Sequence, residues 1–175
     1  MMAGGADLDP TMTVRIVAPI SGRLIPLEEV PDPVFAQRMA GDGVAIEPAA
    51  DPSGGPVTVV APCDGQLAVL FPGGHAMAVV GPGGLEVIVH AGIDTVELQG
   101  AGFETLAKQG DLVRAGQPLV RFDPEALRRG GKRAISPVLV ANVDIVAGME
   151  VSKAAEVRAG RDVLLTVRLK EPWSG

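Results

Sequence analysis

The chain has 175 residues, of which 47% are hydrophobic, and its formal net charge is −6 at pH 7. This length and hydrophobic content suit one folded domain with a sizeable core and exclude a disordered chain. The negative charge argues against binding to nucleic acid, which needs a clustered positive field, and no apolar run reaches the ~18 residues of a membrane span.

The N-terminal segment and the cysteine content indicate the compartment. Residues 1–12 have neither a basic start nor an apolar segment, so they do not form a signal peptide. The single cysteine, Cys63, excludes an internal disulfide and a four-cysteine zinc site. We therefore expect a cytoplasmic protein without direct membrane insertion, with a flexible tail at 1–12 and a single domain at 13–171.

Short apolar and β-branched runs, separated by turns rich in glycine and proline, dominate the chain. Two short helices are expected at 33–39 and 123–129, the second with Asp123 as its N-cap and Pro124 at the first helical position. This pattern predicts an all-β fold, a compact antiparallel sandwich or barrel with a few short helices. The expected strands are 14–17, 57–60, 66–70, 76–80, 85–90, 118–122, 138–140 and 163–169.

Two pairs of segments resemble each other. VAPISGRL at 17–24 matches VAPCDGQL at 60–67, and LVRAGQPLVRF at 112–122 matches EVRAGRDVLLTVRL at 156–169. The members of each pair lie about forty residues apart, and two copies are too few for a solenoid. We therefore expect an internal pseudo-duplication, with one sheet structure built from similar halves.

The chain has two histidines, His75 and His90, and each lies at a strand boundary. The turn at 81–84 joins the two neighbouring strands into an antiparallel hairpin, in which the start of one strand lies beside the end of the next. The sequence therefore predicts that His75 and His90 come together. Strand alternation places Ile88 and His90 on one face.

Two neutral imidazoles at one place fit two kinds of chemistry. In the first, a free ring nitrogen accepts a phosphoryl group, and the second histidine donates a hydrogen bond to the phosphoryl oxygens. In the second, His75, His90 and a carboxylate from Asp94 or from a partner bind zinc. A histidine at a strand end is also commonly an ordinary hydrogen-bonded group, so spacing alone leaves these alternatives open.

Longer patterns surround the histidines and continue along the chain. The most specific is HxGxDTVxLxG, within VIVHAGIDTVELQG at 87–100. The others are EVPDPVF at 29–35, GDGVAIEP at 41–48, VAPCDGQLAVLFPGGHA at 60–76, GDLVRAGQPLVRFD at 110–123 and SPVLVANVD at 136–144. In this order, and over nearly the whole chain except its tail, they closely resemble the glucose-type enzyme IIA family of the sugar phosphotransferase system.

The resemblance implies a phosphotransferase component. It implies that His90 accepts phosphate on Nε2 and that His75 helps to hold the phosphoryl group and pass it on. The implied donor is the phosphohistidine of the carrier HPr, and the implied acceptor is a cysteine of an enzyme IIB domain. No cofactor is required, because the donor is already a phosphoramidate, and contacts with regulatory target proteins are a further possibility.

The resemblance also implies a docking surface around the histidines, made of apolar side chains flanked by carboxylates. We expect Phe35 and Phe71 to be exposed, whereas Val44 and Ile88 suit a core or a surface position equally. The implied docking residues are Asp32, Val34, Phe35, Val44, Phe71, Ile88, Asp94 and Val96.

The sequence departs from the family pattern just before the first histidine. Gly73 stands where the family often has a threonine whose hydroxyl hydrogen-bonds that ring, so the backbone or another group must orient His75. Met77 stands where a phenylalanine is frequent, which keeps the position apolar.

Two rival interpretations remain. The VRAG turns also resemble those of biotinyl and lipoyl carrier domains, in which Lys153 would be the modified lysine. Such domains are shorter and carry the lysine at the tip of a central hairpin. The other rival keeps the fold but uses His75 and His90 to bind zinc or a regulatory partner, without phosphoryl transfer.

Overall fold

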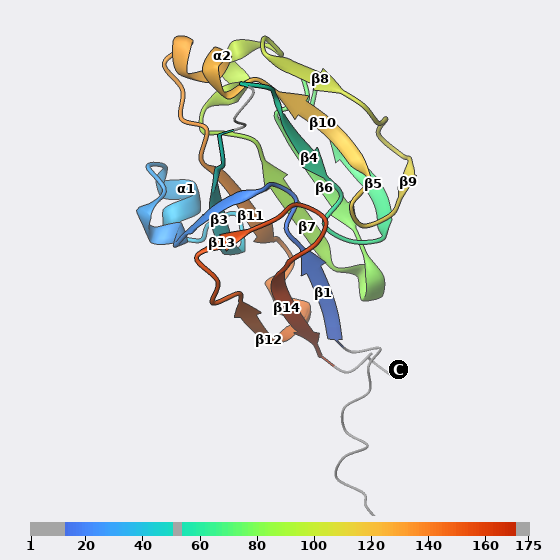
Figure 1. Ribbon diagram of the computed structural model, residues 1–175. Coiled ribbons are helices and arrows are strands. Elements are labelled where there is room, and N and C mark those ends of the chain that lie inside the picture. The colour runs from blue at the N-terminus through green and yellow to red at the C-terminus, as the bar shows by residue number, and fades with distance from the viewer. Residues whose placement is uncertain (1–12, 51–53, 171–175) are drawn as a thin grey trace, which may run out of the picture.

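The chain folds almost entirely into short strands, and the computed structural model describes residues 13–50 and 54–170 (Figure 1). The expected tail at 1–12 lies outside the described residues. Within 13–50 and 54–170, no helix is both long and apolar enough to cross a membrane. In chain order the elements are β1 (Thr13–Val17), β2 (Gly22–Ile25), a 3-10 turn (Leu27–Glu29), α1 (Pro33–Ala36), β3 (Asp42–Pro48), β4 (Val57–Val60), β5 (Gly65–Leu70), β6 (Ala76–Val80), a 3-10 turn (Pro82–Gly84), β7 (Glu86–His90), a 3-10 helix (Thr95–Leu98), β8 (Phe103–Thr105), β9 (Leu112–Val113), β10 (Pro118–Phe122), α2 (Pro124–Arg129), β11 (Ser136–Val140), a 3-10 turn (Val143–Ile145), β12 (Val146–Val151), β13 (Glu156–Val157) and β14 (Val163–Leu169).

Within residues 13–50 and 54–170, the strands form three antiparallel sheets. The largest has eight strands in the order β13-β2-β3-β11-β7-β6-β5-β9, and the two smaller sheets have the orders β1-β14-β12 and β4-β10-β8. The predicted all-β class is confirmed, and the sheets pack on one another without closing into a barrel (Figure 1). The sandwich alternative is therefore the right one.

The predicted similarity of two halves is confirmed by strand pairing. In one half β1 pairs with β14 and β2 with β13; in the other β4 pairs with β10 and β5 with β9. The loops match as well, because Gly160 N donates to Ala18 O and Gly116 N donates to Ala61 O, both at 2.8 Å. The matched sequence pairs therefore occupy equivalent places at the two ends of the large sheet.

Alternate residues of the central strands face two different apolar cores, as the two-residue strand period requires. The larger core lies between the sheets, and the smaller one lies beneath α1 and the 3-10 turn Leu27–Glu29. Residues of β3, β11 and β7 that enter the larger core are Val44, Ile46, Val138, Val140, Val87 and Val89, whereas Ala45, Leu139 and Ile88 belong to or pack against the smaller one. His90 shares the face of Ile88 and so lies on the side of the smaller core.

The helices differ in how well they match expectation. The helix beginning at Pro124 has the expected N-cap, because Asp123 Oδ1 accepts a 2.9 Å hydrogen bond from Glu125 N. The first helix is shorter than predicted and ends at Ala36. Strands β2, β3, β8, β9, β12 and β13 were not predicted, because they are very short or carry polar, glycine and proline residues that disguise the strand pattern.

Candidate active site

The β6–β7 hairpin brings the two histidines together, as the sequence predicts. Ala76 pairs with His90 in the antiparallel register, and Ala91 N donates to His75 O at 2.7 Å. The ring centroids of His75 and His90 are 5.5 Å apart, with an angle of 69° between the ring planes. The two imidazoles are therefore near neighbours, in an edge-to-face arrangement.

One hydrogen bond fixes the tautomer of His90. Its Nδ1 lies 2.6 Å from the carbonyl oxygen of Gly92. A carbonyl oxygen can only accept, so Nδ1 carries the proton and donates. In the neutral ring Nε2 then has no proton and presents a free lone pair. His90 is half-buried, and the backbone two residues further along the chain determines which of its ring nitrogens is unprotonated.

His75 packs against two neighbouring rings. This residue is only 7% exposed, and its ring centroid lies 5.6 Å from that of Phe71 and 5.5 Å from that of His90. Gly73, with a φ of +94°, carries no side chain that could hydrogen-bond the His75 ring. The Pro72 backbone acts on the ring by opposing the lowering of its pKa that burial causes. Of the two sources of orientation that the sequence leaves open, the backbone is the one that this effect favours.

Burial favours the neutral form of both histidines. It is the main reason that the pKa of His75 lies below its usual value of about 6.5, and the neighbouring His90 lowers it further. The pKa of His90 is also lowered by burial, against the opposing effects of the Gly92 carbonyl and then of Asp32 and Asp94. At pH 7 both rings are therefore neutral, which is the state that a nucleophilic nitrogen requires.

Helix α1 covers one side of His90. Asp32 is its N-cap and accepts a 2.9 Å hydrogen bond from Val34 N. The Phe35 and His90 rings lie edge to face, with centroids 5.2 Å apart and an angle of 61° between the ring planes. The expectation that Phe35 is exposed is wrong, because its ring fills the smaller core and is 7% exposed. Phe35 therefore packs against His90 from the side of the smaller core.

The predicted docking residues fall into three groups by exposure. Val34, Phe71 and Val96 are exposed, at 45%, 49% and 57%, as is Asp94. Asp32 and Ile88 are half-buried. Val44 is 4% exposed and belongs to the larger core, on the opposite face of the sheet from His90, so its inclusion among docking residues is wrong.

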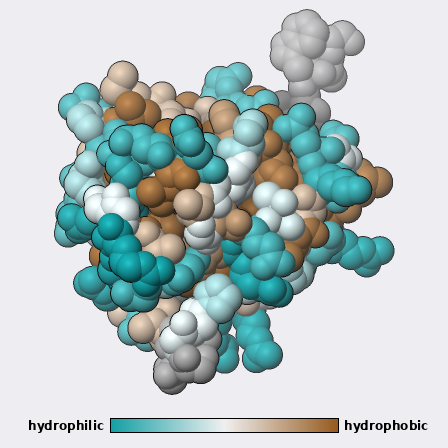
Figure 2. Space-filling view, turned by 90° about the horizontal axis from the view of Figure 1, so that it is seen from above, coloured by the Kyte–Doolittle hydropathy of each residue, from teal (hydrophilic) through white to brown (hydrophobic). Residues whose placement is uncertain are grey.

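Hydrophobic residues reach the surface in patches bordered by hydrophilic ones on the face that Figure 2 shows. The exposed apolar side chains include those of Val34, Phe71 and Val96, together with Met39 at 71% exposure on the segment after α1. Met39 is an exposed apolar side chain that the sequence did not single out.

Metal binding finds little support in the geometry. Across the part of the chain that the structure describes, no three side chains of His, Cys, Asp or Glu lie close enough together to hold a metal ion. Asp94 therefore does not complete a three-ligand zinc site with His75 and His90.

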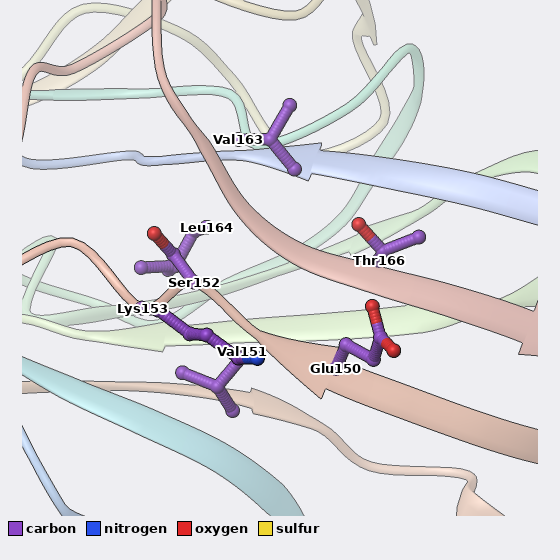
Figure 3. A pocket seen from close by; sticks show the side chains of 7 residues that line it. All are labelled: Glu150, Val151, Ser152, Lys153, Val163, Leu164 and Thr166. Carbon is purple, nitrogen blue, oxygen red and sulfur yellow. The ribbon is translucent and has the colours of Figure 1, made fainter.

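Lys153 lies in a setting unlike that of a modified carrier lysine. It follows β12, which pairs with β14 in one sheet, and precedes β13, which pairs with β2 in another. It therefore sits on a connection between sheets and not at the tip of a hairpin. Figure 3 shows Lys153 among the side chains that line a pocket, together with Glu150, Val151, Ser152, Val163, Leu164 and Thr166; none of them is a histidine.

Sequence reasoning did not identify which backbone groups act on the histidines. Gly92 and Pro72 act through backbone atoms, which residue type does not reveal. The signal that the sequence offers is the glycine two residues after His90. The structure explains why a glycine is needed there, because its φ is +79° and an added Cβ would lie 2.6 Å from Thr95 Cγ2.

Comparison with known proteins agrees with this geometry. Residues 14–146 match the family described as phosphoenolpyruvate-dependent sugar phosphotransferase system, EIIA 1. The chain is 41% identical over 154 residues to the PTS system glucose-specific EIIA component of Oceanobacillus iheyensis, covering 88% of this chain and 90% of that protein. It is 42% identical over 155 residues to the protein of the same name from Halalkalibacterium halodurans, covering 89% and 86%.

A solved structure has the same architecture. The glucose permease IIA from Mycoplasma capricolum superposes with a TM-score of 0.78 at 35% identity, covering 87% of this chain and 95% of that one. The fold and these relatives define the class, a β-sandwich component of a sugar phosphotransferase system. Within that class, the chain belongs to the EIIA 1 family, whose members take part in phosphoryl transfer during sugar uptake.

Proposed function

We propose that this protein is a phosphoryl carrier in which His90 Nε2 accepts phosphate from the phosphohistidine of HPr and passes it to a cysteine of an enzyme IIB domain. The observation that carries this proposal is the 2.6 Å hydrogen bond between His90 Nδ1 and Gly92 O, which leaves Nε2 as the free nitrogen. The second neutral ring 5.5 Å away supports it. Residues 13–171 act as one domain, in the cytoplasm where these partners would meet it.

The transfer step needs no external base. The Nε2 lone pair forms the new N–P bond while the P–N bond of the donor breaks, and the electron pair of that bond stays on the donor's ring. The proton is already on Nδ1, so the His90 ring becomes positive as the bond forms, and the Gly92 carbonyl oxygen stabilises that charge. Because the transition state is loose, positioning supplies most of the catalysis.

His75 and the exposed rim have supporting parts. A neutral His75 ring can donate one hydrogen bond to a phosphoryl oxygen held on His90. Val34, Phe71 and Val96 would lie against the docked partner and exclude water from the transferring group. The carboxylates of Asp32 and Asp94, whose charges reach His90, would attract a basic partner surface.

The sugar is proposed from the relatives. Both named relatives are glucose-specific components, which supports glucose as the first sugar to test. Docking of regulatory target proteins on the same rim is compatible with this function, because Val34, Phe71 and Val96 are exposed and available to more than one partner.

The test is phosphorylation by defined donors. The protein is incubated with phosphoenolpyruvate, enzyme I and HPr, and its intact mass is measured under non-acidic conditions. We expect a gain of one phosphate that is acid-labile and absent in His90→Gln. No gain while HPr itself is phosphorylated, or an unchanged gain in His90→Gln, would contradict the proposal.

A further inference from the structure

The peptide group that joins Ala91 to Gly92 is held at both polar atoms by buried hydroxyls. Thr95 Oγ1 donates to Ala91 O at 2.8 Å, and Gly92 N donates to Ser136 Oγ at 3.1 Å. Thr95 and Ser136 are both 0% exposed. Ser136 Oγ also donates to Ala134 O at 2.8 Å, so its own hydrogen is used. This peptide plane is therefore fixed from two sides in a dry environment.

The following peptide group carries the carbonyl that His90 contacts. Gly92 O accepts from His90 Nδ1, and the nitrogen of the same peptide group, Ile93 N, donates to Arg133 O at 3.0 Å. Between the two anchored planes lies the single residue Gly92, with a φ of +79°. Its conformation alone connects the plane held by the hydroxyls to the plane that faces the imidazole.

Ser136 replaces a backbone partner at the end of a strand. β7 ends at His90, and its pairing with β11 covers Val89, Ile88 and Val87. The N–H of Gly92 lies beyond this ladder, and Ser136, the first residue of β11, supplies the acceptor from 44 residues away in sequence. A buried N–H without a hydrogen-bond acceptor would cost stability, so the Ser136 hydroxyl both satisfies the Gly92 N–H and holds the loop in place.

We propose that Ser136 and Thr95 are positioning residues that clamp the Ala91–Gly92 peptide, aim the Gly92 carbonyl at His90 Nδ1 and so keep Nε2 as the unprotonated nitrogen. Without the clamp, the carbonyl moves away from Nδ1, and the ring gains the alternative neutral tautomer with its proton on Nε2. That tautomer has no lone pair on the attacking atom. The consequence for phosphoryl transfer rests on the function proposed above, whereas the consequence for the tautomer does not.

The test reads the tautomer directly, in the unphosphorylated full chain with ¹⁵N-labelled histidine. Ser136→Ala removes one hydroxyl. Thr95→Val removes the other while keeping the side-chain shape, and Thr95→Ser keeps the hydroxyl but removes the methyl group. Ser21→Ala is the matched control, because Ser21 Oγ accepts from Ala159 N at 2.8 Å in a loop outside the β6–β7 hairpin. Circular dichroism confirms that each variant is folded.

We expect ¹⁵N shifts of His90 that show mainly the Nδ1–H form in the parent protein, in Thr95→Ser and in Ser21→Ala. Ser136→Ala and Thr95→Val should gain the Nε2–H form, and each should slow phosphate uptake about fivefold, the effect of losing one hydrogen bond. If Thr95 acted only by packing, Thr95→Ser would be the more damaging of its two variants.

Parent-like ¹⁵N shifts in folded Ser136→Ala and Thr95→Val would overturn the proposal, even if uptake slowed. If Ser136→Ala does not fold, the comparison of Thr95→Val with Thr95→Ser decides. If the parent protein takes up no phosphate while Ser136→Ala and Thr95→Val still gain the Nε2–H form, the clamp is upheld and the carrier function is contradicted.

Discussion

Gly92 is a position near the histidines where the structure leaves no room for a side chain. Its φ of +79° lies in the left-handed region, and an added Cβ would lie 2.6 Å from Thr95 Cγ2, 2.8 Å from Arg133 O and 2.9 Å from Leu127 Cδ2. Gly131 offers a matched control, because it has a φ of +77° and no heavy atom within 4 Å of an added Cβ. Alanine at the two positions thus meets nearly the same φ but very different space.

The expected losses of stability follow from the left-handed backbone conformation and from the space around an added methyl group. The left-handed conformation costs a non-glycine residue about 1–2 kcal/mol, and this is the whole cost for Gly131→Ala. A methyl group forced into a well-packed core adds about 1–3 kcal/mol. Gly92→Ala should therefore lower the free energy of unfolding by about 2–5 kcal/mol, because one of its contacts is a backbone oxygen that cannot rotate away.

Urea unfolding followed by circular dichroism measures both free energies in the same buffer. The loss for Gly92→Ala should exceed that for Gly131→Ala, and the slope with urea should stay unchanged. Equal losses for the two variants would refute the reasoning, since they would show that the loop after His90 relaxes around the methyl group.

The remaining predictions concern the histidines, pH and the two phenylalanines beside them. His90→Gln should abolish phosphate uptake from phosphorylated HPr, whereas His75→Gln should take up phosphate and pass it on slowly; normal uptake by His90→Gln would contradict the assigned roles. Burial lowers the pKa of both histidines below the unfolded value of about 6.5. In acid the unfolded chain therefore binds more protons than the folded one. The free energy of unfolding should be unaffected by these groups above pH ~6.5 and should decline as the pH falls below it. Urea titrations between pH 5 and 8 test this direction, and a double His→Gln variant should flatten the decline. Phe35→Ala should lower the free energy of unfolding by about 3 kcal/mol, because this ring is 7% exposed. Phe71 is 49% exposed, so Phe71→Ala should leave stability almost unchanged and weaken HPr docking. Comparable stability losses in the two variants would show that the two rings are not packed as described.

The sequence predicted the histidine pair because the information is local. A glycine-rich turn at 81–84 separates two apolar runs, and a hairpin places the start of the first run beside the end of the second. The similar halves were also readable, since 17–24 and 60–67 share a motif and their strands have equivalent partners in the structure. Both inferences need only the residues of the turns, the two-residue period of strands and a comparison of the sequence with itself.

The orientation of the rings depends on contacts between distant segments and could not be read in this way. Gly92 N reaches Ser136 only because β11 lies beside β7 in the large sheet. Phe35 was expected at the surface, yet α1 folds it onto residues of β3 and β11. Burial of an apolar side chain next to a site depends on which segments cover it, and this information is non-local.

The central claim, that Nε2 of His90 carries the phosphoryl group, is tested most directly by NMR of the phosphorylated protein. Protein with ¹⁵N-labelled histidine is phosphorylated through phosphoenolpyruvate, enzyme I and HPr, and the ¹⁵N–³¹P coupling is measured. We predict a coupling to Nε2 of His90, with Nδ1 of the same ring still bearing its proton. A coupling to Nδ1, a phosphate on His75, or no phosphate on either ring would contradict the account.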